Sequence, residues 1–253
     1  MIVKKEHINW GIPVIIAAGI KLFSLFPASV ERYYSEGIYP VISAVQRVLF
    51  GWLPFSIGDV LYGAAVLYLI VGIVRSVKAL IRRRVTKHSF ISGLGRIFKI
   101  ALWIYVLFNL FWGLNYNRLG IGHQLNLRPT AYNVTELQAV LEITVEKLNA
   151  LADTAAKERK QYNKKRLLFM KGKEAYNQLS NKYSFLGYTI PSVKPSIFSY
   201  LGNYLGYTGY YNPFTGEAQV NTAVPLFLQP FTCTHEIGHQ LGYAKEMEAN
   251  FSG

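Results

Sequence analysis

The sequence has little cysteine and no repeated segment, and each shortage excludes a class of protein. Cys233 is the only cysteine among 253 residues, so no disulfide can form within the chain. A small buried side chain is the expected role of this residue. No internal repeat or low-complexity stretch is present either. The sequence therefore argues against both a disulfide scaffold and a repeat architecture.

A polar stripe is missing from three apolar runs, at residues 10–26, 57–74 and 97–114. Each run is close to the ~17–20 residues that a helix needs to cross a bilayer. Helices in the core of a soluble protein normally keep a polar stripe, so three membrane spans are favoured over three core helices. The first run could also be a cleaved signal peptide. Residues 26–29 make a poor small-residue cleavage site, which favours a retained anchor.

Acidic residues are absent between Arg75 and Lys99, where the sequence has eight basic ones. The loop between the first two runs has two acidic and two basic residues. Because short loops rich in Lys and Arg stay in the cytoplasm, we expect the second-to-third loop and the N-terminus to lie inside. The third span then leads outward. Residues 1–114 would form the membrane region of a multi-pass cell-membrane protein, and residues 115–253 an extracytoplasmic domain.

The formal charge of +13 is unevenly distributed, with eight units in the cytoplasmic loop and +4 in the outer domain. Within that domain, the segment Lys157–Lys173 has eight basic residues and one acidic residue. Such stretches can bind nucleic acid, but a tethered outer domain rarely meets any, so no nucleic acid is expected. The partner would be an anionic lipid or an acidic envelope polymer, unless the segment is a solvated helix face and loop.

The outer domain reads as helices followed by a small sheet. Asn133 to Glu136 matches a capping box and predicts a helix that runs to about Lys157. One apolar stripe lies along it, formed by Leu137, Val140, Leu141, Val145, Leu148 and Leu151. A second helix is predicted at residues 172–183, and a turn at 212–216 precedes a strand. The predicted fold class is α+β, with three N-terminal transmembrane helices ahead of this domain.

The strongest chemical signal is a His-Glu-x-x-His sequence near the C-terminal end. On a helix, residues four apart lie on one face, so His235 and His239 can bind one metal ion. Glu236 lies one step round the helix, within reach of a water on that metal. Zinc hydrolases make a nucleophile at neutral pH in this way. Pro230 favours a helix start before the motif and Gly242 an end after it, so the chain would turn back toward the metal.

A catalytic zinc ion takes three protein ligands and leaves one position for water, so a third ligand is expected from Tyr243 onward. Lys245 stands where the HExxHxxGxxH motif has its third histidine. Glu246 and Glu248 remain, and on a helix they point to nearly opposite sides. Glu246 is the first choice and Glu248 the second, because Asn250 shares the face of Glu246 and could accept a hydrogen bond from a ligand ring.

Two stretches resemble known families. Glu246–Asn250 is similar to the Glu-x-x-Ala-Asp/Asn element that supplies the third ligand in several HExxH-plus-Glu metallopeptidases, the gluzincin type. The longer stretch YTGYYNPFTGEAQVN…PFTCTHEIGHQLGYAKEMEANF resembles an uncharacterised bacterial membrane family, the domain-of-unknown-function 3810 (DUF3810) family. The resemblance implies a zincin-like fold, Zn2+ bound by His235, His239 and Glu246, and Glu236 as general base.

By analogy with zincins, one strand would be the sheet edge that pairs with an extended substrate. Its residues are Glu217, Ala218, Gln219, Val220 and Asn221. The sequence departs from most gluzincins in the shorter spacing between His239 and Glu246. It also ends at Gly253, two turns into the helix that would carry Glu246, so a longer parent protein is expected.

The expected function is hydrolysis of a peptide or protein outside the cytoplasm by a membrane-anchored zinc metallopeptidase. Glu236 would accept the proton of the attacking water and deliver it to the leaving amine. An oxyanion stabiliser is also needed, and four candidates stay unranked: Tyr210, Tyr211, Tyr243 and His123. Two alternatives remain, a zincin-like domain that binds a partner or envelope component without catalysis, and a membrane protein in which the two histidines are structural.

Overall fold

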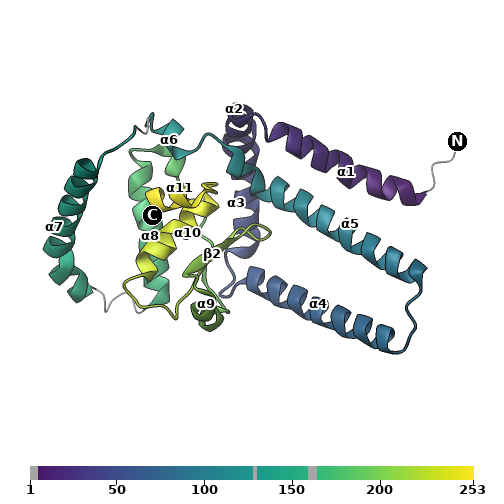
Figure 1. Ribbon diagram of the computed structural model, residues 1–253. Helices are drawn as coiled ribbons and strands as arrows, with labels where there is room; N and C mark the ends of the chain where they lie inside the picture. Colours follow the sequence, from purple (N-terminus) through teal and green to yellow (C-terminus); the bar gives the residue numbers. More distant parts are fainter. Residues whose placement is uncertain (1–4, 128–129, 159–163) are drawn as a thin grey trace. The chain divides into compact units, whose positions relative to one another are not determined.

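The computed structural model describes residues 5–127, 130–158 and 164–253, and the chain divides into two compact units. Unit 1 comprises residues 1–119 and 211–217, and unit 2 comprises residues 120–210 and 218–253. Helices dominate the described residues, which also form one three-stranded sheet (Figure 1). This mixture agrees with the predicted α+β class.

Unit 1 contains the apolar helices. Among the described residues, α4 (Ile57–Ile81) and α5 (Lys87–Phe111) are long and apolar enough to cross a membrane. A third crossing requires that Trp10–Phe23 of α1 (Lys5–Phe23) and the helical stretch Pro27–Phe50 count as one span, bent by 103°. The second and third predicted spans therefore lie largely on α4 and α5, which suit the chain for membrane association.

A helical stretch occupies the segment between the first two apolar runs, where the sequence predicts a loop. It consists of α2 (Pro27–Ser29), the π-helical η1 (Val30–Ile38) and α3 (Tyr39–Phe50). Four aliphatic residues in it have the spacing of one helix face: Ile38, Val41, Val45 and Val48. This short periodic pattern explains why a helix forms here.

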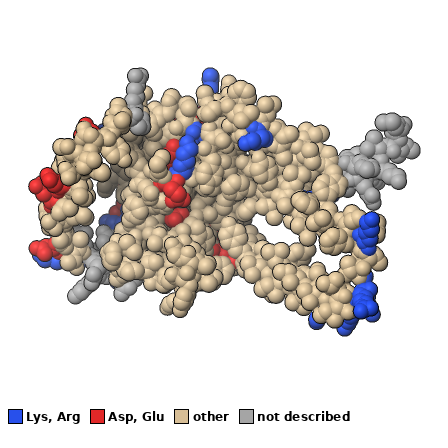
Figure 2. Space-filling model, in the orientation of Figure 1, with Lys and Arg blue, Asp and Glu red and all other residues tan. Residues whose placement is uncertain are grey.

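Basic charge gathers at one end of the two long helices. The loop that joins α4 to α5 includes Arg82, Arg83 and Arg84. On the face seen in Figure 2, Lys and Arg side chains lie where the two helices join, and most of the remaining helix surface is neither basic nor acidic. The asymmetry behind the predicted orientation is thus concentrated at this end of the pair.

Polar contacts within unit 1 fix a hairpin tip, residues 211–217, to the start of α4. The backbone N–H groups of Ile57 and Gly58 donate to the carboxylate of Glu217, at 3.2 and 2.6 Å. The hydroxyl of Thr215 donates to the same carboxylate at 2.9 Å. An anion at the N-terminus of a helix is favoured by the helix dipole. Glu217 therefore acts as a cap for α4.

Unit 2 contains most of the remaining helices. They are α6 (Ile121–Gln124), α7 (Val134–Glu158), α8 (Lys165–Ser180), the 3-10 turn η4 (Ser184–Leu186), α9 (Ser199–Leu205), α10 (Gln229–Gln240) and α11 (Glu246–Ser252). The 3-10 turn η2 (Gly113–Asn117) belongs to unit 1.

The predicted capping box of α7 is present: the N–H of Glu136 donates to Oδ1 of Asn133 at 2.9 Å, and the N–H of Asn133 donates to Oε2 of Glu136 at 2.8 Å. α8 begins before the predicted residue 172, because Leu168 is already buried.

The sheet consists of β1 (Val193–Pro195), β2 (Gly209–Asn212) and β3 (Glu217–Val220) in the order β1-β3-β2, with β1 and β3 parallel. The predicted turn before β3 is present, and Oδ1 of Asn212 accepts a hydrogen bond from the N–H of Phe214 at 2.9 Å. The prediction that residues 217–221 form a sheet edge is wrong, because β3 has a neighbour on each side. The edges of the described sheet are β1 and β2.

The core of unit 2 packs α8 and α10 together with residues of the sheet. Its buried members are Ile121, Tyr176, Leu186, Tyr188, Val220, Cys233, Ile237 and Tyr243. Gly172 of α8 allows the two helices to approach closely, since a Cβ there would lie 2.7 Å from Sγ of Cys233. Cys233 is a free, buried cysteine, as expected. This packing holds α10, the helix that carries the His-Glu-x-x-His sequence.

Candidate metal centre

α10 ends directly after the His-Glu-x-x-His sequence. Pro230 occupies its first turn, and Gly242 follows its end with φ of 90°, in the left-handed region that favours glycine. The N–H groups of Gly242 and Tyr243 donate to the carbonyls of His239 and Gly238, at 3.0 and 3.1 Å. The chain therefore reverses immediately beyond His239.

Three potential ligands converge beside this turn. Nε2 of His235 lies 3.2 Å from Oε2 of Glu246, and Nε2 of His239 lies 3.5 Å from Oε1 of the same carboxylate. The ligand atoms of all three residues lie within 4.8 Å of one another. Zinc bonds of about 2.0–2.2 Å in a tetrahedron would place ligand atoms ~3.4 Å apart. The residue types and their spacing fit a zinc ion.

The ring of His239 is oriented to present Nε2. Its Nδ1 lies 2.8 Å from the carbonyl oxygen of Tyr243, and because a carbonyl only accepts, Nδ1 is the donor. Burial, followed by the nearby His235, lowers the pKa of His239, which favours the neutral ring. Nε2 and the Glu246 carboxylate are then two acceptors that face each other. A cation between them would resolve this arrangement.

Close packing of α10 against α11 positions Glu246. Gly238 permits it, since a Cβ there would lie 2.5 Å from Oγ of Ser252 and 3.4 Å from Cα of Ala249. The hydroxyl of Tyr176 donates to the carbonyl of Thr234 at 2.9 Å and lies 3.2 Å from Oγ of Ser252. Tyr176 of α8 therefore ties both helices together.

The two acidic residues of α11 have different surroundings. Glu246 lies beside the histidines with its side chain 75% exposed, whereas the side chain of Glu248 is 11% exposed. A Cβ at Gly120 would overlap the carboxylate of Glu248, so Glu248 packs against the turn where Gly120 has φ of 87°. The first-choice ligand, and not the second, lies next to the two imidazoles.

Asn250 does not hold a histidine ring, and this prediction is wrong. Asn250 is exposed, and Nδ1 of His239 bonds to the backbone of Tyr243 instead. Nδ1 of His235 is buried without a hydrogen-bond partner among the described residues. The reason is the tight turn at Gly242, which brings a backbone carbonyl to the ring while residue 250 faces outward.

Glu236 is buried next to the start of β2. The residue is 3% exposed, and its Oε2 has no hydrogen-bond partner in the described part of the chain. A Cβ at Gly209 would lie 2.6 Å from Oε1 of Glu236, so glycine alone fits at this position of β2. Burial, and next the charge of Glu246, raise the pKa of Glu236 well above that of an ordinary carboxyl. Buried polar atoms without partners are rare, which marks Glu236 as a candidate for chemistry.

The four candidate oxyanion stabilisers lie in different environments. Tyr211 is buried in unit 1, against Trp112 at a ring-centroid distance of 5.1 Å. The hydroxyl of Tyr243 donates to Gln124 at 2.8 Å, and His123 is exposed on α6. Tyr210 follows Gly209 in β2 and is half-buried. Its neighbour Gly209 packs against Glu236, whereas the hydroxyl of Tyr210 itself lies 2.8 Å from Oγ of Ser196.

Three parts of this site are not predicted from the sequence: Gly238, Gly209 and the backbone carbonyl of Tyr243. A backbone carbonyl such as that of Tyr243 leaves no mark in the side-chain pattern. Gly238 inside a helix and Gly209 inside a strand are readable signals, because glycine weakens both elements unless something approaches closely. These two positions would have pointed to the packing of α11 and to the location of Glu236.

The basic segment Lys157–Lys173 is only partly described, since residues 159–163 lie outside the described ranges. Within α8, Nζ of Lys171 lies 2.8 Å from Oε2 of Glu174 in an exposed ion pair. Exposed ion pairs of this kind contribute little to the stability of the fold. The anionic partner of the segment stays a prediction.

A family model described as "Protein of unknown function (DUF3810)" matches residues 34–253. The match extends from η1 through α11 and includes the three converging residues. No curated protein and no solved structure matches the chain.

Proposed function

The chain belongs to the DUF3810 family, whose description assigns no activity, and we propose that it is a membrane-anchored, zinc-dependent metallopeptidase with a zincin-like domain. One observation carries the proposal: His235, His239 and Glu246 converge, and the motif that supplies the histidines also contains a buried acid, Glu236. Two imidazoles and a carboxylate are ligands that catalytic zinc uses, and three protein ligands leave one position for water.

The residues around the histidines would orient the three ligands of Zn2+. The hydrogen bond from Nδ1 of His239 to Tyr243 sets the tautomer and the ring direction. Packing of Gly238 against α11 keeps Glu246 next to both rings. Bound there, the ion supplies a Lewis acid and a water of lowered pKa.

Glu236 would move the proton. Its carboxylate takes the proton of the attacking water and passes it to the leaving amine, which is the ordinary role of the glutamate in this motif. Oε2 makes no hydrogen bond to any described residue, so it is available for that proton. The absence of a side chain at Gly209 leaves the start of β2 directly against the carboxylate.

The substrate would be an extended peptide that pairs with β2. This strand is an edge of the described sheet and begins at Gly209, next to Glu236. Backbone hydrogen bonds to a sheet edge bind peptides with little dependence on their sequence. The docking strand is therefore proposed one position along the sheet from residues 217–221.

The basic loop between α4 and α5 supports a location in the cell membrane with this loop and the N-terminus in the cytoplasm. Residues after α5 would then be extracytoplasmic, where the segment Lys157–Lys173 could meet anionic lipid or an acidic polymer. Reporter fusions after Lys87 and after Gly120 test this orientation. A cytoplasmic signal from the fusion after Gly120 would refute it.

A Glu236→Gln variant tests the enzymatic proposal. We expect wild-type protein purified in detergent to contain one zinc ion per chain and to cleave casein or a peptide library. The variant should retain the zinc and lose about 10²–10⁴-fold in rate, which is the usual contribution of a general acid–base group. Absence of stoichiometric zinc from the wild type would reject the metal centre. Zinc without any cleavage would favour the alternative, a zincin-like binding module.

A further inference from the structure

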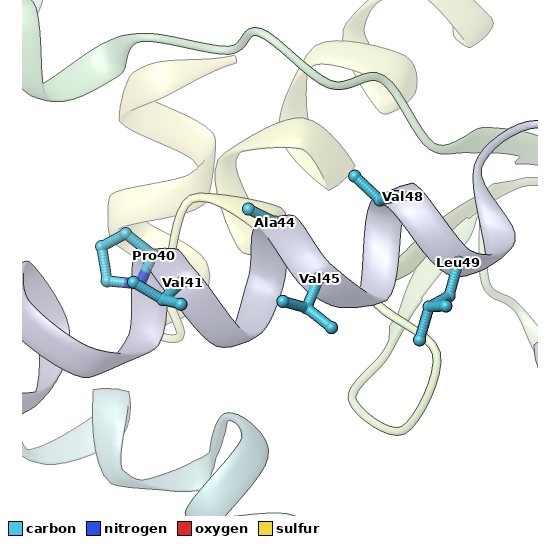
Figure 3. A pocket seen from close by; sticks show the side chains of 6 residues that line it. All are labelled: Pro40, Val41, Ala44, Val45, Val48 and Leu49. Carbon is cyan, nitrogen blue, oxygen red and sulfur yellow. The ribbon is translucent and has the colours of Figure 1, made fainter.

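α3 has the reverse of the usual pattern for a helix at the surface of a soluble protein. Its inward side is polar, with Tyr39, Ser43, Gln46 and Arg47 buried. Its outward side is aliphatic: Val41 is 64% exposed and Val48 is 58% exposed. Figure 3 shows the side chains of this aliphatic side on successive turns of the helix: Pro40, Val41, Ala44, Val45, Val48 and Leu49. In water, a surface helix turns such a stripe toward the core.

The polar side of α3 is held by the hairpin tip of the same unit. The hydroxyls of Tyr39 and Tyr211 lie 3.4 Å apart, and Nε2 of Gln46 donates to the carbonyl of Pro213 at 2.8 Å. A Cβ at Gly216 would lie 2.7 Å from Cβ of Gln46, so the tip approaches the helix closely. These contacts fix the rotation of α3 and leave its aliphatic side outward.

The direction of α3 indicates what covers that side. The stretch Pro27–Phe50 is bent by 103° from Trp10–Phe23 of α1, and α1 packs along α5. If α5 crosses the bilayer, a helix nearly perpendicular to its neighbour α1 lies close to the membrane plane. The linker from α3 to α4 has the exposed Trp52, a residue type enriched at the membrane interface. The aliphatic side of α3 is thus continuous in sequence with the apolar surface of α4.

A membrane crossing by α3, alone or together with η1, is disfavoured. α3 has 12 residues, which at ~1.5 Å per residue is shorter than the hydrocarbon core. The preceding η1 has the exposed charges Arg32 and Glu36. An exposed charge is costly inside the bilayer, so only the aliphatic part of the stretch suits lipid.

We propose that α3 is an interfacial helix that lies in the plane of the bilayer, with Val41, Val45 and Val48 toward the acyl chains and its polar side toward the hairpin tip. The proposal rests on the membrane placement of α4 and α5 proposed above. It gives α3 a definite partner, the lipid acyl region. From the membrane surface, the helix then supports the hairpin tip, residues 211–217, which connects β2 to β3.

Spin labels on single introduced cysteines test the proposal in lipid nanodiscs. The sites are Val41→Cys, Val45→Cys and Val48→Cys, with Leu69→Cys of α4 as the lipid control and Glu142→Cys of α7 as the water control; the controls are exposed residues. The native Cys233 is buried, and unaltered protein shows whether it takes up label. Collisions with oxygen report lipid, and collisions with a neutral nickel chelate report water.

We expect all three α3 sites to collide with oxygen as Leu69→Cys does, at one common depth. Nickel access equal to that of Glu142→Cys would overturn the proposal, and so would low access to both reagents, which indicates a covering protein such as a second copy. A depth change of ~10 Å between Val41 and Val48 would mean that the helix crosses the bilayer. If Leu69→Cys itself reports water, the membrane placement of α4 fails together with this inference.

Discussion

α3 of unit 1 and α10 of unit 2 are both 12-residue helices with a proline in the first turn, and both bury polar side chains. In α3, the buried Gln46 donates through Nε2 to a backbone carbonyl of the hairpin tip, its Oε1 has no hydrogen-bond partner among the described residues, and the aliphatic side faces outward. In α10, His235 and Glu236 each have a buried atom without a hydrogen-bond partner among the described residues. Both helices therefore bury polar groups, but α3 exposes an aliphatic side whereas α10 buries Cys233 and Ile237 in the core of unit 2.

The difference shows how buried polar residues should be interpreted. Polar groups that are bonded within the chain, beneath an exposed aliphatic face, indicate an apolar environment on the other side of the helix. Polar groups that converge and still lack partners indicate a ligand. Composition alone does not separate the two cases, and the convergence of His235, His239 and Glu246 at α10 does.

The largest effect is expected from removing one of the three converging residues. Glu246→Gln should lower zinc affinity more than about 100-fold, since changes outside the ligand shell already cost 10–100-fold. Glu248→Gln is the matched control on the same helix, because its side chain packs against Gly120. It should keep stoichiometric zinc. Metal analysis and zinc titration of both purified variants provide the comparison, and equal losses in the two would mean that Glu246 is not a ligand.

The next effect concerns the polar contacts of unit 1, which we interpret as structural. Glu217→Ala removes the acceptor of the N–H groups of Ile57 and Gly58. Leaving such groups unsatisfied costs about 1–3 kcal/mol each at buried sites, so the first turn of α4 should open more easily. Hydrogen exchange by mass spectrometry should show faster exchange in that turn, while zinc content stays unchanged. Loss of zinc with unchanged exchange would assign Glu217 to the metal centre instead.

Much of the fold could be predicted from the sequence because its signals are local. Long apolar runs predict α4 and α5, and the Asn133–Glu136 box predicts the start of α7. α3 is not predicted because its aliphatic stripe is short and the polar residues of its buried side, such as Gln46 and Arg47, interrupt the apolar run in the sequence. The central position of β3 also could not be predicted, since a parallel partner such as β1 comes from a distant segment of the chain.

The site could be predicted only in its side chains. The spacing of His235 and His239 follows from helix geometry. Glu246 is preferred because Asn250 shares its face, and although Asn250 holds no ring, the three residues do converge. The ring partner could not be predicted, because the carbonyl of Tyr243 reaches His239 through the turn at Gly242. That turn depends on backbone geometry, which side-chain patterns record only through the glycine.

A smaller effect on zinc affinity is expected from a substitution at Gly238. This change alters the packing of α10 against α11 and leaves all three proposed ligands in place. Gly238→Ala places a methyl group 2.5 Å from Oγ of Ser252, so α11 must shift. Zinc affinity should fall about 10–100-fold, as for other supporting residues. Gly122→Ala is a control with open space around it, and it should bind zinc like the wild type. Unchanged affinity in Gly238→Ala would show that α11 tolerates the displacement.

The smallest effect comes from the two buried glutamines, one in each helix. Gln240 accepts from the hydroxyl of Tyr188 at 2.6 Å and donates to the carbonyl of Ser192 at 3.0 Å, whereas Gln46 donates to Pro213. Replacement by Leu should cost about 2 kcal/mol at Gln240 and about 1 kcal/mol at Gln46, because two partners lose a bond in the first case and one in the second. Local exchange rates in each unit measure the difference. Equal costs would show that the loss of the single bond from Gln46 to Pro213 destabilises the protein as much as the loss of both bonds of Gln240.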